Sequence, residues 1–233
     1  MFRYIVLGII GLLSSNAVAQ HAPPQNGAST APSAAASAPT AKAVVAMEEP
    51  LPGDRWTYEV RDEITGTIKE TRTDVVTEVT PTEISTRIDI SGKPNPGLIT
   101  YDRSWNMLSS GPWKYSPNDG TGIRMPLSEG KSWNFEANEV NVGDGNGWKR
   151  SGKSKVVGQE TVSTKAGTFE TFKIETSFSA RNVKDPTRRI DITVQLWYAP
   201  AVAHWVKRTH SQRAEKRLMV HNTIELVEYG RKQ

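Results

Sequence analysis

The sequence predicts an all-β fold, built as a strongly curved antiparallel sheet, an open barrel or a sandwich. Three observations lead to this prediction. Short runs alternate apolar and polar residues, clusters of Gly, Pro and Asn separate these runs, and no window has the apolar spacing of an amphipathic helix. The chain has no cysteine, so disulfides, thiolate metal sites and a cysteine nucleophile are excluded and the fold depends on packing alone.

Residues 1–19 have the three parts of a secretory signal peptide. Arg3 precedes an apolar run at 4–13, and Ala17-Val18-Ala19 supplies the small residues of a cleavage site. The apolar run falls well short of the roughly 20 residues that a membrane-spanning helix requires. We therefore expect cleavage after Ala19, no transmembrane segment in the mature protein, and a periplasmic or secreted location.

Residues 20–50 are rich in Ala, Pro, Ser and Thr and contain almost no large apolar side chains. Such a segment buries too little surface to offset the entropy lost on ordering it. We expect a disordered tether here, followed by a β domain at 51–233.

The strands of this domain are predicted from alternation and turn residues. The clearest signal is a β-hairpin at 155–175, whose two runs of Val, Thr, Phe and Ile meet at Lys165-Ala166-Gly167. Glycine supplies the backbone freedom that a tight reversal needs. The expected strands cover 54–61, 67–79, 83–91, 98–107, 131–138, 147–158, 168–182, 189–198, 204–213 and 218–229.

Two segments of the β domain are similar to each other, at 53–60 and 130–137. Both contain Gly, then Trp, an aromatic residue two positions later and Glu, and a Val-Val strand follows each of them. This similarity predicts two fused β units at 51–128 and 129–233. Chance similarity is the alternative, because few positions match.

Aromatic residues in the strands are the candidate ligand contacts. Trp56 and Tyr58 share one face of their strand, as do Trp133 and Phe135, because residues two apart point the same way. Burial in the core explains them better than a ligand platform does, since aromatic side chains have the largest burial energy. The residues expected to contact a ligand, if one is bound, are Trp56, Tyr58, Trp133, Phe135, Trp197 and Trp205.

Three of the four histidines fall in the last predicted hairpin. With a four-residue loop at 214–217, His210 would face His221 with their Cβ atoms about 5 Å apart, and such a pair can bind a divalent metal. A stable metal site usually needs more ligands, and His204 and Glu225 lie too far along the strands. An exposed, pH-sensitive histidine pair is therefore favoured over a metal site, and no cofactor is expected.

Charge and motifs exclude several other functions. The formal net charge is only +4, and the basic doublets at 149–150, 188–189 and 207–208 are interpreted as solvated strand faces, so nucleic acid is not expected as a partner. The Gly-rich loops at 118–120 and 143–147 are better explained as hairpin turns than as calcium sites. No nucleophile elbow, zinc-protease helix or phosphate-binding loop is present, so no catalytic residue is assigned.

Several motifs resemble one group of exported proteins. They are Leu51-Pro-Gly-Asp-Arg-Trp-Thr-Tyr58, Gly130-Lys-Ser-Trp133, the hairpin sequence at 157–169 with its Ala-Gly-Thr-Phe turn, and Trp197-Tyr-Ala-Pro200. The chain is similar in these motifs to exported proteobacterial proteins of unknown function of the TapB-like kind. This resemblance covers mainly residues 130–210 and implies a β domain of the cell envelope without assigned catalytic residues.

Taken together, these features favour a non-enzymatic envelope protein that binds an apolar or amphipathic ligand such as a lipid. The motivation is seven tryptophans, export and the missing catalytic motifs. Two alternatives stay open: a protein–protein interaction module in envelope assembly, and a hydrolase of envelope polymers.

Overall fold

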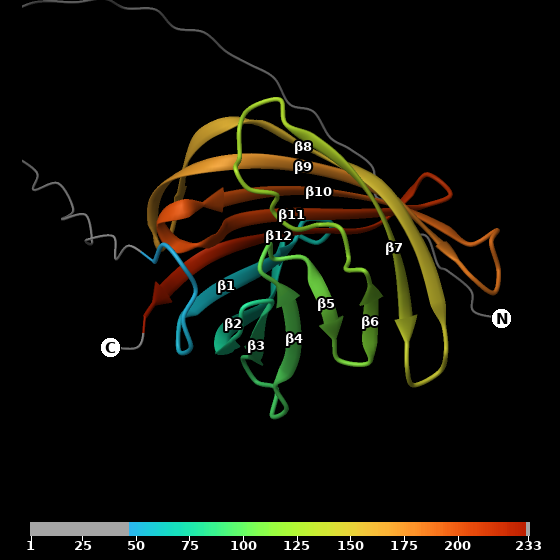
Figure 1. The fold of residues 1–233 in the computed structure, drawn as a ribbon, viewed down its shortest axis with the longest axis horizontal. Helices are drawn as coiled ribbons and strands as arrows, with labels where there is room; N and C mark the ends of the chain where they lie inside the picture. The colour runs from blue at the N-terminus through green and yellow to red at the C-terminus, as the bar shows by residue number, and fades with distance from the viewer. Residues whose placement is uncertain (1–46, 232–233) are drawn as a thin grey trace, which may run out of the picture. The chain divides into compact units, whose positions relative to one another are not determined.

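Twelve antiparallel strands close into a barrel in the computed structural model, which describes residues 47–231 (Figure 1). The predicted all-β, antiparallel class is confirmed, and the sheet is a closed barrel rather than an open one. The predicted signal peptide at 1–19 and most of the predicted tether at 20–50 lie outside the described residues. Within residues 47–231, no helix has the length and apolar character needed to cross a bilayer.

Each strand pairs with its neighbours in sequence, and β1 pairs with β12 to close the barrel. The only helix among the described residues is a short 3-10 turn, η1 (Pro200–Val202). The strands are β1 (Arg55–Asp62), β2 (Thr67–Val79), β3 (Glu83–Ile90), β4 (Gly97–Asp102), β5 (Met107–Ser110), β6 (Trp113–Ser116), β7 (Ser132–Asn141), β8 (Gly147–Thr164), β9 (Gly167–Asn182), β10 (Arg189–Ala199), β11 (His204–Ala214) and β12 (Arg217–Gly230).

Neither β5 nor β6 was predicted as a separate strand from the sequence. The strand expected at 98–107 ends at Asp102, and the chain reverses through Trp105, which has a φ of 58°. β5 and β6 have only four residues each. Runs of that length are too short to show an alternating pattern.

An aromatic cluster fills one end of the barrel. It consists of Trp56, Tyr58, Trp105, His204 and Trp205, all of which are buried. The His204 ring stacks on Trp56 with centroids 4.4 Å apart and meets Trp105 edge-on at 4.5 Å. The Tyr58 hydroxyl donates its single proton to the Trp205 carbonyl at 2.9 Å and therefore accepts a hydrogen bond from Nδ1 of His204. Burial lowers the pKa of His204 well below its usual value, so this histidine is a neutral part of the core.

The connection between β6 and β7 enters the barrel. Asp119 and Ile123 are buried in it, and Asp119 accepts hydrogen bonds from the Met107 backbone N–H at 2.8 Å and from Thr121. The hairpin turn expected at 118–120 is therefore wrong, because these residues belong to a long inward connection. The other expected turn, at 143–147, does join β7 and β8.

The two similar segments begin β1 and β7 with the same local geometry. Gly53 and Gly130 have φ values of 93° and 81°, which favour glycine. The N–H of Gly53 donates to the Val76 carbonyl at 2.8 Å, and the N–H of Gly130 donates to the Val156 carbonyl at 2.9 Å. Both segments lie in one continuous barrel, and the division into units at 51–128 and 129–233 stays a prediction.

Candidate functional site

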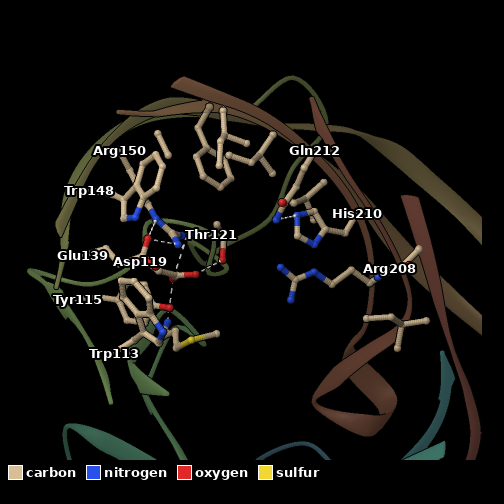
Figure 2. Close-up of a pocket in the computed structure, with 18 of the residues that line it drawn as sticks. Trp113, Tyr115, Asp119, Thr121, Glu139, Trp148, Arg150, Arg208, His210 and Gln212 are labelled. Carbon is tan, nitrogen blue, oxygen red and sulfur yellow. Dashed lines mark hydrogen bonds and ion pairs between the residues drawn. The ribbon is translucent and has the colours of Figure 1, made fainter. Parts of the chain in front are cut away.

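The barrel contains a cavity of about 490 Å³ at the end opposite the aromatic cluster (Figure 2). Several of its lining residues lie beside the hairpin turns of that end, and others, such as Arg208, lie further along the strands. Glu139 and Trp148 flank the β7–β8 turn, and Gln212 lies shortly before the β11–β12 turn. These turns meet at one end because neighbouring strands run antiparallel. The barrel therefore has one packed end and one hollow end.

One wall of the cavity is apolar. Alternate residues of β9 and β10 point inward, because side chains of a strand alternate between its two faces. The inward residues that line the cavity are Phe178, Ala180, Ile190, Ile192 and Val194.

A polar wall adjoins the apolar one and comes mainly from β11, the strand that pairs with β10. Arg208, His210 and Gln212 follow each other at two-residue spacing and all line the cavity. A β-bulge decides which residues of β11 point into the cavity. Trp197 pairs with Lys207 and Tyr198 pairs with Trp205, which leaves Val206 as the extra residue. As a result, Trp205 and Arg208 both face the interior, whereas Lys207 lies on the outer face and pairs with Glu225 at 2.7 Å.

Two of the three cavity arginines have a carboxylate partner. The Nε atom of Arg72 lies 3.3 Å from Oδ1 of Asp74, a side chain that is 3% exposed. The Nε atom of Arg150 donates to Oε2 of Glu139 at 2.6 Å. Burial of both ion pairs is compensated by their own attraction, so neither arginine is left as an isolated charge.

The third arginine, Arg208, has no such partner. Among residues 47–231 it makes no ion pair, and its Nε–H is buried without an acceptor. Figure 2 shows its side chain reaching from β11 toward the centre of the cavity. Its guanidinium carbon lies 5.9 Å from the ring centroid of Trp205. Burial lowers the pKa of Arg208, and the opposite charge of Asp119 offsets this effect only in part.

His210 is a neutral neighbour of this arginine. Its Nε2 atom lies 3.3 Å from Nε2 of Gln212. Burial, together with the charges of Arg208 and Arg150, lowers the pKa of His210 to about 4. At neutral pH the ring therefore has one N–H donor and one acceptor facing the cavity.

The expected pairing of His210 with His221 is wrong. The β11–β12 turn has two residues, Glu215 and Lys216, both with positive φ, instead of the four residues assumed, and a bulge follows at 212–213. The resulting register pairs His210 with Asn222 and His221 with Ser211. Since adjacent residues of a strand point to opposite faces, His210 faces the cavity and His221 faces outward. The two histidines therefore do not face each other, although the prediction of a metal site required that they do.

The six aromatic residues proposed as ligand contacts are all buried, and none of them lines the large cavity. Trp56, Tyr58 and Trp205 come together in the aromatic cluster. Two of them lie beside cavity arginines, Tyr58 beside Arg72 at 5.7 Å and Trp205 beside Arg208 at 5.9 Å. Phe135 packs against Phe178, which does line the cavity, with ring centroids 5.7 Å apart.

The remaining two of these aromatics lie apart from both groups. Trp133 lies under the guanidinium of Arg124. Trp197 is flanked by the ammonium groups of Lys173 and Lys207 at 4.9 and 5.7 Å from its ring centroid.

Sequence reasoning missed the arginines because it treated the basic doublets as solvated. In two of these doublets, one member faces the cavity, namely Arg150 and Arg208. The signal was present, since Arg208, His210 and Gln212 share one face by alternation. Alternation along the strand shows that these three side chains share a face, but it does not show whether that face points into the barrel or outward.

Residues 134–221 match a family described as DUF3108-like. This stretch runs from β7 into β12 and includes Arg150, Arg208 and His210. No curated protein has significant sequence similarity to the chain.

Two solved structures have a similar fold. A presumed lipoprotein from Parabacteroides distasonis gives a TM-score of 0.54 at 15% identity, covering 81% of this chain and 100% of that chain. A presumed exported protein with a YmcC-like fold from Bacteroides fragilis gives a TM-score of 0.52 at 16% identity, covering 78% of this chain and 97% of that chain. At such low identities, this similarity shows a shared fold.

Proposed function

We propose that this protein is a non-enzymatic envelope protein that binds an amphipathic small molecule inside its barrel. The observation that carries this proposal is the cavity of about 490 Å³, which has an apolar wall on β9 and β10 and a polar wall on β11. Cavities of roughly 300–1,000 Å³ that combine apolar walls with a few polar groups are typical small-molecule sites.

An exported location is supported by two independent features. Residues 1–19 have the pattern of a signal peptide. The two proteins of similar fold are named as a presumed lipoprotein and a presumed exported protein. We also propose that the protein is related to the TapB-like exported proteins of proteobacteria. The DUF3108-like match at 134–221 overlaps the stretch at 130–210 that carries this resemblance.

The proposal is tested by filling the cavity. Ile192→Trp places an indole against the apolar wall, whereas Thr193→Trp, its control, places one on the exposed outer face of the same strand. A fluorescent fatty acid should bind wild type and Thr193→Trp equally, and Ile192→Trp should weaken binding at least about tenfold by occluding the space that the ligand needs. Absence of binding to wild type, or equal binding to folded Ile192→Trp, would overturn the proposal.

A protein interaction module is the second candidate, and exposed apolar side chains favour it. Most of the exposed large apolar residues lie at the hollow end of the barrel, where such a group marks a contact surface. They are Ile64, Ile68, Leu98, Val140, Val142, Val183, Leu218 and Met219. Among the described residues every strand is paired on both sides, so strand addition has no free edge to use. If this candidate is correct, Val142→Asp should abolish retention of a periplasmic partner that Leu51→Asp, at the packed end, still retains.

The hydrolase alternative has no comparable support. His204 and His210 hydrogen-bond to Tyr58 and Gln212 rather than to a serine.

A further inference from the structure

We propose that Arg208 recognises a single carboxylate on the amphipathic ligand and so orients the molecule in the barrel. This inference rests on the proposed function and names the chemical class of the ligand. The head group would lie against β11 with the apolar chain along β9 and β10.

Arg208 has no ion-pair partner in the part of the chain that the structure describes. A guanidinium removed from water is costly unless a counter-charge or hydrogen-bond acceptors replace the water. Arg72 and Arg150 follow this rule through Asp74 and Glu139. Arg208 departs from it although it lines the same cavity, because it has no ion pair among the described residues. Its Nε–H lacks a hydrogen-bond acceptor, as does that of Arg72, but Arg72 has the Asp74 carboxylate beside it. A bound anion supplies the partner that the protein does not.

The carboxylate whose charge acts most strongly on Arg208, that of Asp119, is already engaged. Asp119 lines the cavity, but its Oδ1 accepts the Met107 N–H at 2.8 Å and its Oδ2 accepts the Thr121 hydroxyl at 2.5 Å. These bonds hold the carboxylate to its own connection, and it forms no ion pair with Arg208 within the described part of the chain.

The hydrogen-bond donors around the cavity suit a carboxylate. Guanidinium presents parallel N–H groups that match the two oxygens of a carboxylate. His210 and Gln212 extend along the same face of β11, and Asn222 lies opposite His210 on β12. An amide or imidazole N–H from these residues is available to an oxygen that also binds Arg208.

The charges on the cavity wall favour a ligand with one negative charge over a ligand with two. After the pairs of Arg72 and Arg150 are counted, Arg208 is the remaining arginine on the cavity wall. Glu70, Asp119 and Glu139 line the same cavity, and their carboxylates would repel a second negative charge on the ligand. A carboxylate therefore fits better than the dianion of a phosphate monoester.

The test compares three variants of the full chain. Arg208→Met removes the charge and keeps a long side chain, and Arg208→Lys keeps the charge without the planar fork. Lys207→Met is the matched control, because Lys207 is the adjacent cation on the outer face. Binding is measured by calorimetry with dodecanoate, dodecanol, dodecyl phosphate and acetate, and each variant is also unfolded thermally without ligand.

Dodecanoate should bind wild type about 10- to 100-fold more tightly than dodecanol, because a charge-assisted hydrogen bond usually strengthens binding by that factor. Arg208→Met should lose that advantage and keep the affinity for dodecanol, Arg208→Lys should be intermediate, and Lys207→Met should behave as wild type. Arg208→Met should also melt at or above the wild-type temperature, because it removes a partly buried charge that has no ion pair among the described residues.

Several results would overturn the inference. Equal binding of dodecanoate and dodecanol would leave the amphipathic-ligand function standing and remove the role of Arg208. Tighter binding of dodecyl phosphate than of dodecanoate would replace carboxylate by phosphate, and binding of acetate as tight as dodecanoate would remove the amphipathic requirement. A strongly destabilised Arg208→Met protein would assign Arg208 a structural role. If neither dodecanoate nor dodecanol binds, the proposed function fails as well.

Discussion

At the scale of single residues, the cavity keeps polar side chains in an interior that the packed end of the barrel fills with aromatic rings. His210 and His204 differ in surroundings, yet burial lowers the pKa of both. A histidine that is neutral in the folded chain and charged in the unfolded chain makes stability depend on pH.

His210 therefore yields a prediction with a defined sign. Its folded-state pKa of about 4 lies below the unfolded value of about 6.5. As pH falls from 6.5 toward 4, His210 becomes protonated in the unfolded chain but stays neutral in the folded chain. The free energy of unfolding therefore decreases. The contribution of one such group is at most about 1.4 kcal/mol per pH unit. His210→Gln should flatten the pH dependence of the unfolding free energy in this window, and urea titrations at several pH values measure it.

The control for this experiment is His221→Gln. His221 lies on the outer face of β12 and does not line the cavity, so its variant should keep most of the wild-type slope. An unchanged slope in His210→Gln would show that His210 does not titrate as its surroundings imply.

At the scale of elements, the β8–β9 hairpin is the strand pair that the sequence predicted most clearly, and the structure confirms its turn. Gly167 follows Lys165 and Ala166 at the tip and has a φ of 140°. Residues with a side chain rarely adopt this conformation.

Gly167→Val should lower the unfolding free energy by about 1–3 kcal/mol, because valine must adopt a backbone conformation that only glycine tolerates easily. Crowding contributes little, since a Cβ atom there would lie 3.7 Å from the nearest atom of Phe169. Denaturant unfolding measures the loss. Gly158→Val on β8 is the control: its added Cβ meets nothing within 4 Å and its φ is not positive, so a change of less than about 0.5 kcal/mol is expected. Equal losses in the two variants would contradict this account.

At the scale of the whole molecule, the barrel depends on the β1–β12 seam, which joins the first strand to the last. Arg231, just after β12, donates from Nε and Nη2 to the two oxygens of Asp54 at 2.8 and 2.9 Å. Asp54 is fully buried just before β1. This bidentate ion pair links the residue before the first strand to the residue after the last strand.

Arg231→Ala should destabilise the protein by about 1–3 kcal/mol, because it leaves a buried carboxylate without its cation. Thermal or urea unfolding measures the effect. Adding Asp54→Asn to this variant should restore part of the loss, since a neutral amide is easier to bury than a charge. The control is Arg55→Ala, whose pair with Glu228 is 3.7 Å long and largely exposed, so a loss of less than about 1 kcal/mol is expected. A larger loss in Arg55→Ala than in Arg231→Ala would contradict the role of Asp54.

The sequence by itself determined the all-β class, most strand positions and the glycine turns at 143–147 and 165–167. Local chemistry suffices for these features, because alternation and turn residues act within a few neighbours. Only the tertiary structure decided that the sheet closes, that Arg208 and His210 face the interior, and that His210 pairs with Asn222 instead of His221. These outcomes depend on register. The bulge at Val206 decides which face each following side chain of β11 takes, and the two-residue turn with the bulge at 212–213 sets the pairing of β12 with β11.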